Sequence, residues 1–288
     1  LVGEVVETGD EVDTCRPGDR VAMRIDWPSC GQMEIEPPCD ACAEGRYMLC
    51  RNVGMRDLPL RHPGGGFSPR MVMHRSQPFV VPAGLSQDAA LLLEPLASAV
   101  HGVLAAPPED GDRVLVVGAG TIGLLAIQAL KARGCTLVAA ADVAPERLEL
   151  ARRLGADALV DTRTVDPAAE MRRFTDGRGA DVAVEAVGLP ATVRIAVESV
   201  RKGGALALVG NFSPEVPLPL QSVVTREISL LGSCASNGEY PACLELMARR
   251  RVDVRPLISA VAPLAEGPSW FKRLYDREPG LLKVILAP

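Results

Sequence analysis

Four cysteines stand close together near the start of the chain, at Cys30, Cys39, Cys42 and Cys50. Thiolates are ligands that Zn²⁺ prefers, and four of them complete its tetrahedral shell. A shell closed in this way leaves no open position for a substrate, so the ion would be structural. It could hold together a loop that has no core of its own. We therefore predict a structural zinc site, with free or oxidised thiols as the alternative.

The second pattern is a glycine-rich turn, Gly118-Ala119-Gly120-Thr121-Ile122-Gly123. Gly118 permits backbone angles that a Cβ would forbid, Gly120 leaves room for a pyrophosphate, and Gly123 lets the following helix pack closely. The N–H groups of Thr121, Ile122 and Gly123 then face the ligand, where the helix dipole favours an anion. The turn predicts a dinucleotide site, and a tight βα turn that binds nothing is the alternative.

Asp142 follows Gly123 by nineteen residues and ends the next predicted strand. A carboxylate at this place can accept both hydrogen bonds from the adenosine ribose diol. A 2′-phosphate about 5 Å away, at an effective dielectric near 20, would be penalised by roughly 3 kcal/mol per pair of charges. We therefore expect NAD rather than NADP. Arg147 either stacks on the adenine, reaches a phosphate, or is only a solvated helix residue.

These residues need a strand, a turn and a helix to position them, and the pattern continues along the chain. Apolar runs predict strands and amphipathic runs predict helices in alternation from residue 113 to 231. Six strands with crossover helices make an α/β fold, a doubly wound parallel sheet of the Rossmann type. At the carboxyl edge of that sheet we expect four residues to lie near the nicotinamide or to be ordinary loop residues: Val187, Val209, Asn211 and Ser233.

Composition restricts the class of protein. The chain has 288 residues, of which 48% are hydrophobic, enough for two cores. A net charge of -5 gives no reason to expect a nucleic-acid partner. The longest uncharged run, residues 114–130, is short for a membrane span and is interrupted by glycines. With no secretion signal visible, we expect a cytoplasmic protein without a membrane partner.

The amino-terminal region carries a family resemblance. Gly3, Gly9 and the turn Pro17-Gly18-Asp19-Arg20-Val21 stand as they do in the zinc-dependent medium-chain alcohol and polyol dehydrogenases. The spacing of Cys39, Cys42 and Cys50 also resembles the structural-zinc lobe of that family. Eight residues separate Cys30 from Cys39 where the family usually has two. Either the loop carries an insertion, or Cys30 is not a ligand.

The resemblance covers essentially the whole chain and implies both its fold and its division into domains. We expect a truncated GroES-like, mostly β catalytic domain at residues 1–94, a Rossmann domain at 95–235, and a return to the catalytic domain at 236–288. Within the outer segments we predict short strands at Met71–Met73 and Pro256–Ser259. The family resemblance also implies a homodimer or homotetramer.

Glu94, in Glu94-Pro95-Leu96, lies within a predicted apolar helix from Asp88 to Leu104. A carboxylate there is costly unless it is paired, ligated or protonated. In the polyol branch of the family a Glu-Pro at this place lies beside the catalytic zinc, which makes Glu94 our candidate catalytic and metal-binding residue. A capped or exposed glutamate is the alternative. Lys283 resembles a basic residue that reaches the cofactor pyrophosphate, and a solvated lysine is the alternative.

Other catalytic zinc ligands of the family are not found in the sequence. The family's Gly-His-Glu motif would end immediately before Leu1, and none of His62, His74 and His101 is followed by glutamate. The chain begins with Leu1, so we expect it to be the remainder of a longer protein and to bind NAD without turnover. In the complete enzyme NAD would accept hydride from a secondary alcohol or polyol bound to zinc. A non-catalytic NAD-binding protein and a zinc-free quinone or enoyl reductase are the alternatives.

Overall fold

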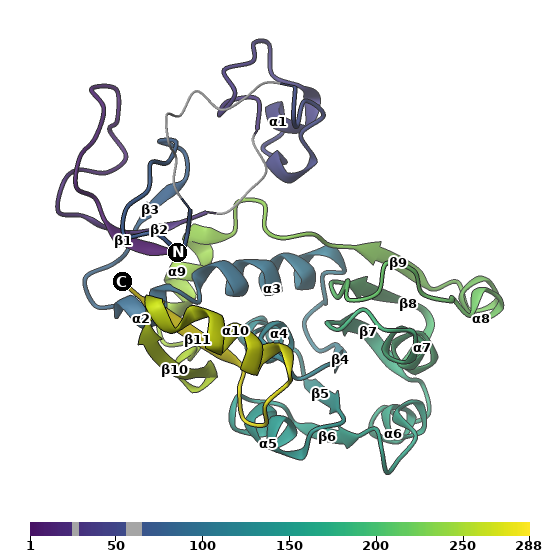
Figure 1. The fold of residues 1–288 in the computed structure, drawn as a ribbon. Coiled ribbons are helices and arrows are strands. Elements are labelled where there is room, and N and C mark those ends of the chain that lie inside the picture. The colour runs from purple at the N-terminus through teal and green to yellow at the C-terminus, as the bar shows by residue number, and fades with distance from the viewer. Residues whose placement is uncertain (25–28, 56–64) are drawn as a thin grey trace. The chain divides into compact units, whose positions relative to one another are not determined.

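The computed structural model describes residues 1–24, 29–55 and 65–288, which fold as two compact units (Figure 1). The sheet unit comprises Ser98–Cys234 and Arg250–Asp253. The cysteine unit comprises Leu1–Ala97, Ala235–Arg249 and Val254–Pro288. The predicted divisions followed residues 94 and 235, and they did not anticipate the four residues that return to the sheet unit.

The sheet unit is built on six parallel strands in the order β6-β5-β4-β7-β8-β9. The strands are β4 (Arg113–Val117), β5 (Leu137–Asp142), β6 (Ala158–Asp161), β7 (Ala180–Glu185), β8 (Val200–Leu208) and β9 (Ser229–Gly232). The order reverses between β4 and β7, which makes the sheet doubly wound and confirms the predicted fold.

Helices cover the sheet on both faces, as Figure 1 shows. They are α4 (Thr121–Ala132), α5 (Pro145–Arg153), α6 (Pro167–Phe174), α7 (Pro190–Ser199) and α8 (Leu220–Thr225). Helix α4 packs against α5, and α6 packs against α7, so the two pairs lie on opposite faces. Buried on both sides, β4 and β5 read as continuous apolar runs, including Val116, Ala139 and Ala140.

The start of α6 is set by two neighbouring residues. Asp166 is the N-cap residue, and its side chain accepts a 3.0 Å hydrogen bond from the N–H of Ala168. Pro167 occupies the first helical position, where its missing N–H costs nothing.

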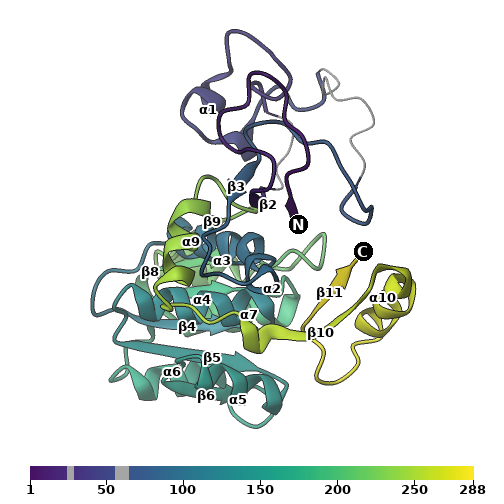
Figure 2. The same ribbon diagram turned by 90° about the vertical axis from the view of Figure 1, so that its left-hand side faces the viewer.

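The cysteine unit has two small sheets. Strands β1 (Val2–Glu4), β2 (Arg20–Met23) and β3 (Pro78–Val80) are antiparallel, and β10 (Ile258–Pro263) pairs in parallel with β11 (Lys283–Ala287) (Figure 2). Its helical elements are α1 (Asp40–Ala43), η1 (Tyr47–Leu49), α2 (Gln87–Ala90), α9 (Tyr240–Ala248), η2 (Arg255–Leu257), η3 (Leu264–Glu266) and α10 (Gly267–Tyr275). Tyr240 is fully buried, and its hydroxyl donates to the carbonyl of Met23.

Of two strands predicted in this unit, one is absent and the other begins later than predicted. Residues Met71–Met73 form no strand, and β3 is the strand that completes the antiparallel sheet beside β2. The segment predicted as Pro256–Ser259 begins as the 3-10 helix η2, and the strand β10 starts only at Ile258.

The single helix predicted from Asp88 to Leu104 is two helices, α2 and α3 (Leu93–Ala105). Pro95 explains the break, because proline has no N–H and is tolerated only in the first turn of a helix. Among the described residues, Gln87–Ala105 is the one segment whose length and composition would suffice to cross a membrane, and more than half of its most apolar window is buried. Buried core helices share that composition, so this is weak support for a membrane span.

Candidate functional site

The glycine turn joins β4 to α4, and each of its three glycines has a different environment. Gly118 has a φ of +97°, and a Cβ there would lie 2.4 Å from Cγ2 of Val187. A Cβ on Gly123 would lie 1.8 Å from the carbonyl oxygen of Gly118. A Cβ on Gly120 would meet no protein atom within 4 Å. Gly118 and Gly123 are therefore needed for the fold, whereas Gly120 borders open space.

The start of α4 presents backbone donors beside Gly120, which is the N-cap residue of that helix. The first N–H groups of an α-helix have no partner within it, so those of Thr121, Ile122 and Gly123 are available to a ligand. Helix α4 is twelve residues long, and its dipole adds a positive potential at this end. The turn can therefore bind an anion such as a pyrophosphate.

Asp142 ends β5 next to this turn and is 9% exposed. Its Oδ2 accepts a 2.7 Å hydrogen bond from the N–H of Ala119, and its Oδ1 accepts one of 2.9 Å from Ala144. Each carboxylate oxygen can accept more than one hydrogen bond, so capacity remains for a ribose diol. Arg147 follows in the first turn of α5 and is partly buried.

The residues predicted near the nicotinamide lie where β7, β8 and β9 end. Val187 and Val209 are partly exposed, and Asn211 is exposed. Ser233 follows β9, and its N–H donates to the carbonyl of Leu208 at 2.9 Å. The hydroxyl oxygen of Ser233 is buried and has no hydrogen-bond partner among the described residues.

Sequence reasoning missed Glu185, the last residue of β7, which is 0% exposed. Its carboxylate accepts hydrogen bonds from the N–H groups of Val187 and Gly188, at 3.0 and 2.8 Å. A carboxylate directly after the apolar run Val182-Ala183-Val184 was the signal that could have found it, because a buried charge needs partners.

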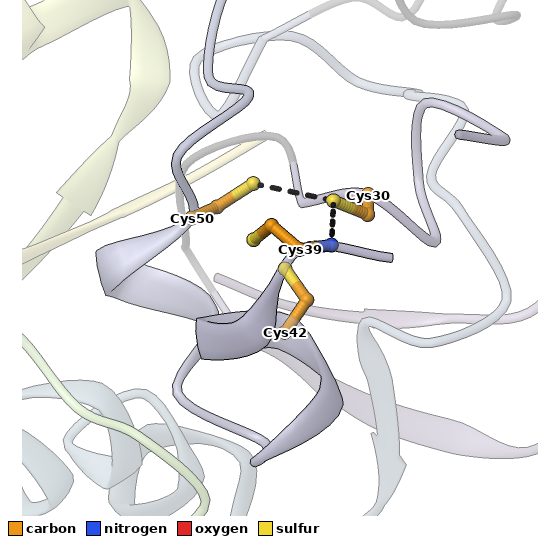
Figure 3. A group of neighbouring side chains, drawn as sticks. All are labelled: Cys30, Cys39, Cys42 and Cys50. Atoms are coloured by element: carbon orange, nitrogen blue, oxygen red, sulfur yellow. Dashed lines mark hydrogen bonds between the residues drawn. The ribbon is translucent and has the colours of Figure 1, made fainter. Parts of the chain in front are cut away.

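The four cysteines come together in the cysteine unit, as Figure 3 shows. Their sulfur atoms all lie within 4.8 Å of one another, and those of Cys30 and Cys50 are 3.7 Å apart. Zinc bound to sulfur at about 2.3 Å in a tetrahedron separates the sulfur atoms by about 3.8 Å. The arrangement therefore fits a structural zinc ion. Cys30 belongs to the cluster, so the longer spacing to Cys39 reflects a longer loop.

Amide groups surround these sulfur atoms. The N–H of Arg51 donates to the sulfur of Cys39 at 3.4 Å, and the N–H of Cys39 donates to Cys30 at 3.3 Å. The hydrogen bond from Arg51 is the largest of the effects that lower the pKa of Cys39 to about 6, whereas burial raises the pKa of Cys42 to about 12. Amide donors of this kind stabilise thiolates, which are the form that binds metal.

Glu94 lies outside this cluster, in the first turn of α3, and is partly buried. The positive end of the helix dipole favours a carboxylate there, which reduces the cost that our sequence argument assigned to it. Glu94 and Lys283 are both close enough to the backbone nitrogen of Leu1 to act on it electrostatically. Both residues therefore lie near Leu1 in the cysteine unit.

Over residues 1–24, 29–55 and 65–288, the cysteine cluster is the only group of three or more metal-binding side chains. His74 is engaged with the hydroxyl of Ser76 at 2.9 Å. His62 lies outside the described residues.

Comparison with known proteins agrees with this architecture. Residues 121–249 match the family model described as zinc-binding dehydrogenase, and residues 1–83 match the alcohol dehydrogenase GroES-like domain. Sorbitol dehydrogenase of Bacillus subtilis (strain 168) is 33% identical over 287 residues, which cover 99% of this chain and 79% of that protein. Alcohol dehydrogenase from Thermus sp. ATN1 superimposes with a TM-score of 0.86 at 30% identity, covering 99% of this chain and 82% of that one.

A third relative was solved with a cofactor. A protein from Sinorhizobium meliloti 1021, provisionally described as a zinc-binding dehydrogenase and bound to NADP, has a TM-score of 0.86 at 29% identity. The match covers 100% of this chain and 82% of that one.

These matches define the class as oxidoreductases that combine a GroES-like domain with a nucleotide-binding sheet. Within that class the chain belongs to the zinc-dependent medium-chain alcohol and polyol dehydrogenase family. The expected family and fold are confirmed. A nicotinamide dinucleotide and zinc are the cofactors that fit the family and the sites described above.

Proposed function

We propose that this chain binds NAD in the sheet unit and serves the oxidation of a secondary alcohol of a polyol or sugar alcohol. The observation that carries the proposal is the pairing of Asp142 with the glycine turn through Ala119. The pyrophosphate would rest on the N–H groups at the start of α4, and the ribose diol would bind Asp142. NAD carries the redox chemistry, and the protein binds and orients it.

We assign the preference for NAD over NADP to Asp142. A 2′-phosphate at about 5 Å from this carboxylate would be opposed by roughly 3 kcal/mol per pair of charges. One solved relative is bound to NADP, so the affinity of this chain must be measured for both cofactors. Arg147, in the first turn of α5, is the nearby cation that we propose to contact the adenine or a phosphate.

The remaining cofactor and metal roles are proposals of the same kind. Val187, Val209, Asn211 and Ser233 lie at the strand ends where we place the nicotinamide. Glu94 as a catalytic zinc neighbour and Lys283 as a pyrophosphate contact depend on the family resemblance. We place one zinc ion in the cysteine cluster, where it would hold the loop together and take no part in the chemistry.

The substrate class is supported by the similarity to a sorbitol dehydrogenase. We also propose a homodimer or homotetramer. Strand β9 ends the six-stranded sheet, and edge strands are places where a second chain can pair. A cytoplasmic location is supported by cysteines that gather at a metal-type site instead of forming disulfides.

Calorimetric titration of the folded, zinc-loaded chain tests the proposal. We expect saturable binding of NAD and NADH and at least tenfold weaker binding of NADPH. Sorbitol and other polyols are then added with NAD, and a rise in absorbance at the NADH band shows which of them is oxidised. Absence of saturation with both NAD and NADH would refute the proposed cofactor site.

A further inference from the structure

Both the side chain and the backbone carbonyl of Glu185 accept hydrogen bonds from the loops that follow β7 and β8. Its Oε1 accepts from the N–H groups of Val187 and Gly188, and its Oε2 accepts a second bond from Gly188 at 3.0 Å. Its backbone carbonyl accepts from Val209 and Gly210, at 2.9 and 3.0 Å. A single buried residue therefore fixes the backbone at the ends of both β7 and β8.

The two loops that Glu185 fixes are in direct backbone contact. A Cβ on Gly188 would lie 2.4 Å from the amide nitrogen of Asn211, and a Cβ on Gly210 would lie 2.2 Å from the amide nitrogen of Gly188. The N–H of Phe212 donates to Val187 at 3.3 Å. These contacts leave no room for side chains at Gly188 and Gly210, so the position of one loop depends on that of the other.

The first of these loops also lies on the glycine turn. The side chain of Val187 occupies the space beside Gly118, where a Cβ would be 2.4 Å from it. The N–H of Ala186 donates to the carbonyl of Val117 at 2.9 Å. Glu185 therefore sets the position of Val187 relative to the turn that we assign to the pyrophosphate.

We propose that Glu185 is a positioning residue for the nicotinamide half of the cofactor. It holds Val187 and, through Val209, the start of the loop that carries Asn211, so that their backbone groups face the carboxamide. This inference rests on the proposed binding of NAD. It differs from a general structural role because the residues at the adenosine end, Asp142 and the N–H groups of α4, make no hydrogen bond to Glu185 in the part of the chain described.

A carboxylate is needed at this position because the side chain takes part in three hydrogen bonds and is the acceptor in all of them. In Glu185→Gln, one oxygen remains as an acceptor, and the amide NH₂ takes the other place. With that oxygen in the place of Oε1, the bonds from Val187 and Gly188 to it are kept, but the NH₂ in the place of Oε2 lies 3.0 Å from the nitrogen of Gly188, which is a contact between two donors. The loop from Ala186 to Gly188 must then shift, while the turn at Gly118 keeps its own bonds to β5.

NADH and ADP-ribose distinguish the two halves of the site, because ADP-ribose lacks the nicotinamide. In Glu185→Gln we expect the dissociation constant of NADH to rise about tenfold and that of ADP-ribose to change less than about twofold. The fluorescence of bound NADH should lose part of its enhancement, since its nicotinamide is held less firmly. Calorimetry and fluorescence titration measure these quantities.

Asp181→Asn is the matched control, since Asp181 is a buried carboxylate at the other end of the same strand, β7. It should lower stability without changing the ratio of the NADH and ADP-ribose dissociation constants. If Glu185→Gln does not fold, Glu185→Asp, which shortens the side chain and keeps the charge, takes its place with the same expectation.

Equal weakening of NADH and ADP-ribose in the Glu185 variant would overturn the inference and leave a structural role. Unchanged binding of both ligands would overturn it as well. If the unaltered chain bound neither ligand, the proposed function itself would fail, which is a distinguishable result.

Discussion

The N–H of Ala119 donates a hydrogen bond of 2.7 Å to Oδ2 of Asp142, which joins the glycine turn to the end of the neighbouring strand. The residue expected to recognise the ribose therefore also holds the turn expected to bind the pyrophosphate. Because one carboxylate serves both tasks, its removal should affect the two contacts with the cofactor together.

Asp142→Ala should weaken NADH binding about 100-fold, since two hydrogen bonds to a charged group are worth about 3 kcal/mol in sum. Asp142→Asn keeps one acceptor oxygen and should lose about tenfold, while discriminating less against NADPH. Calorimetry with both cofactors measures this. Asp161→Asn removes the acid that ends the adjacent strand β6 and should leave NADH binding within about twofold. Wild-type affinity in Asp142→Ala would contradict the ribose assignment.

Gly120→Ala and Gly123→Ala should separate binding from folding. A Cβ at Gly123 would overlap the carbonyl of Gly118, so we expect a loss of about 3 kcal/mol in the free energy of unfolding. At Gly120 the added Cβ meets no protein atom and φ is -80°, so stability should hardly change. NADH affinity should nevertheless fall at least tenfold. Urea unfolding and calorimetry test the pair, and normal affinity in Gly120→Ala would remove the turn as the binding site.

The cysteine cluster should hold about one zinc ion per chain by elemental analysis. The double variant Cys39→Ser, Cys42→Ser should hold almost none and should unfold at a lower temperature, because the metal stabilises the loop. Cys234→Ser, which changes an exposed cysteine of the sheet unit, is the control and should keep the zinc. Zinc should be released as the pH falls, since protons compete for the thiolates. A full zinc content in the double variant would mean that the ion lies elsewhere.

Asp181 should give the sheet unit a stability that depends on pH. Burial acts to raise the pKa of its carboxyl, but hydrogen bonds from the Arg113 N–H and the Arg201 guanidinium, at 3.0 and 2.6 Å, outweigh it and hold the pKa below its ordinary value. A depressed pKa in the folded state adds stability above the unfolded value of about 3.9, and that contribution is lost as the pH falls through the folded value.

Asp181→Asn should therefore cost about 2 kcal/mol near pH 7. The difference from the unaltered chain should shrink as the pH falls below about 4. Urea unfolding at a series of pH values measures both quantities. A cost that does not depend on pH would show that the side-chain shape of Asp181 matters and its charge does not.

The sequence predicted the parts of the site whose residues are close together along the chain. The strand, turn, helix and terminal acid from Arg113 to Asp142 lie in one continuous segment, and their periodicity and glycine spacing were enough. The start of α6 at Asp166 and Pro167 was predictable for the same reason, because a cap needs only local hydrogen bonds.

Features that depend on contacts distant in sequence were not predictable. Gly188 and Gly210 are required by each other, and nothing next to either of them indicates that the two backbones touch. Met71–Met73 has the composition of a strand, yet it pairs with no strand of the small antiparallel sheet. Whether Cys30 joins the cluster depended on the path of an eight-residue loop, which spacing alone does not determine.

The side-chain amide of Gln128 in α4 forms two hydrogen bonds with the backbone of Asp253, one as donor and one as acceptor, as a neighbouring β-strand would. Its Nε2 donates to the carbonyl of Asp253 at 3.1 Å, and its Oε1 accepts from the N–H of the same residue at 2.7 Å. A sheet unit cut from the chain after residue 234 would therefore lose both hydrogen bonds to Asp253 and keep only the 3.5 Å bond from Nε2 to the carbonyl of Leu124. Shortening the protein to its cofactor half calls for Arg250–Asp253 to be grafted back, or for Gln128 to be replaced by an apolar residue.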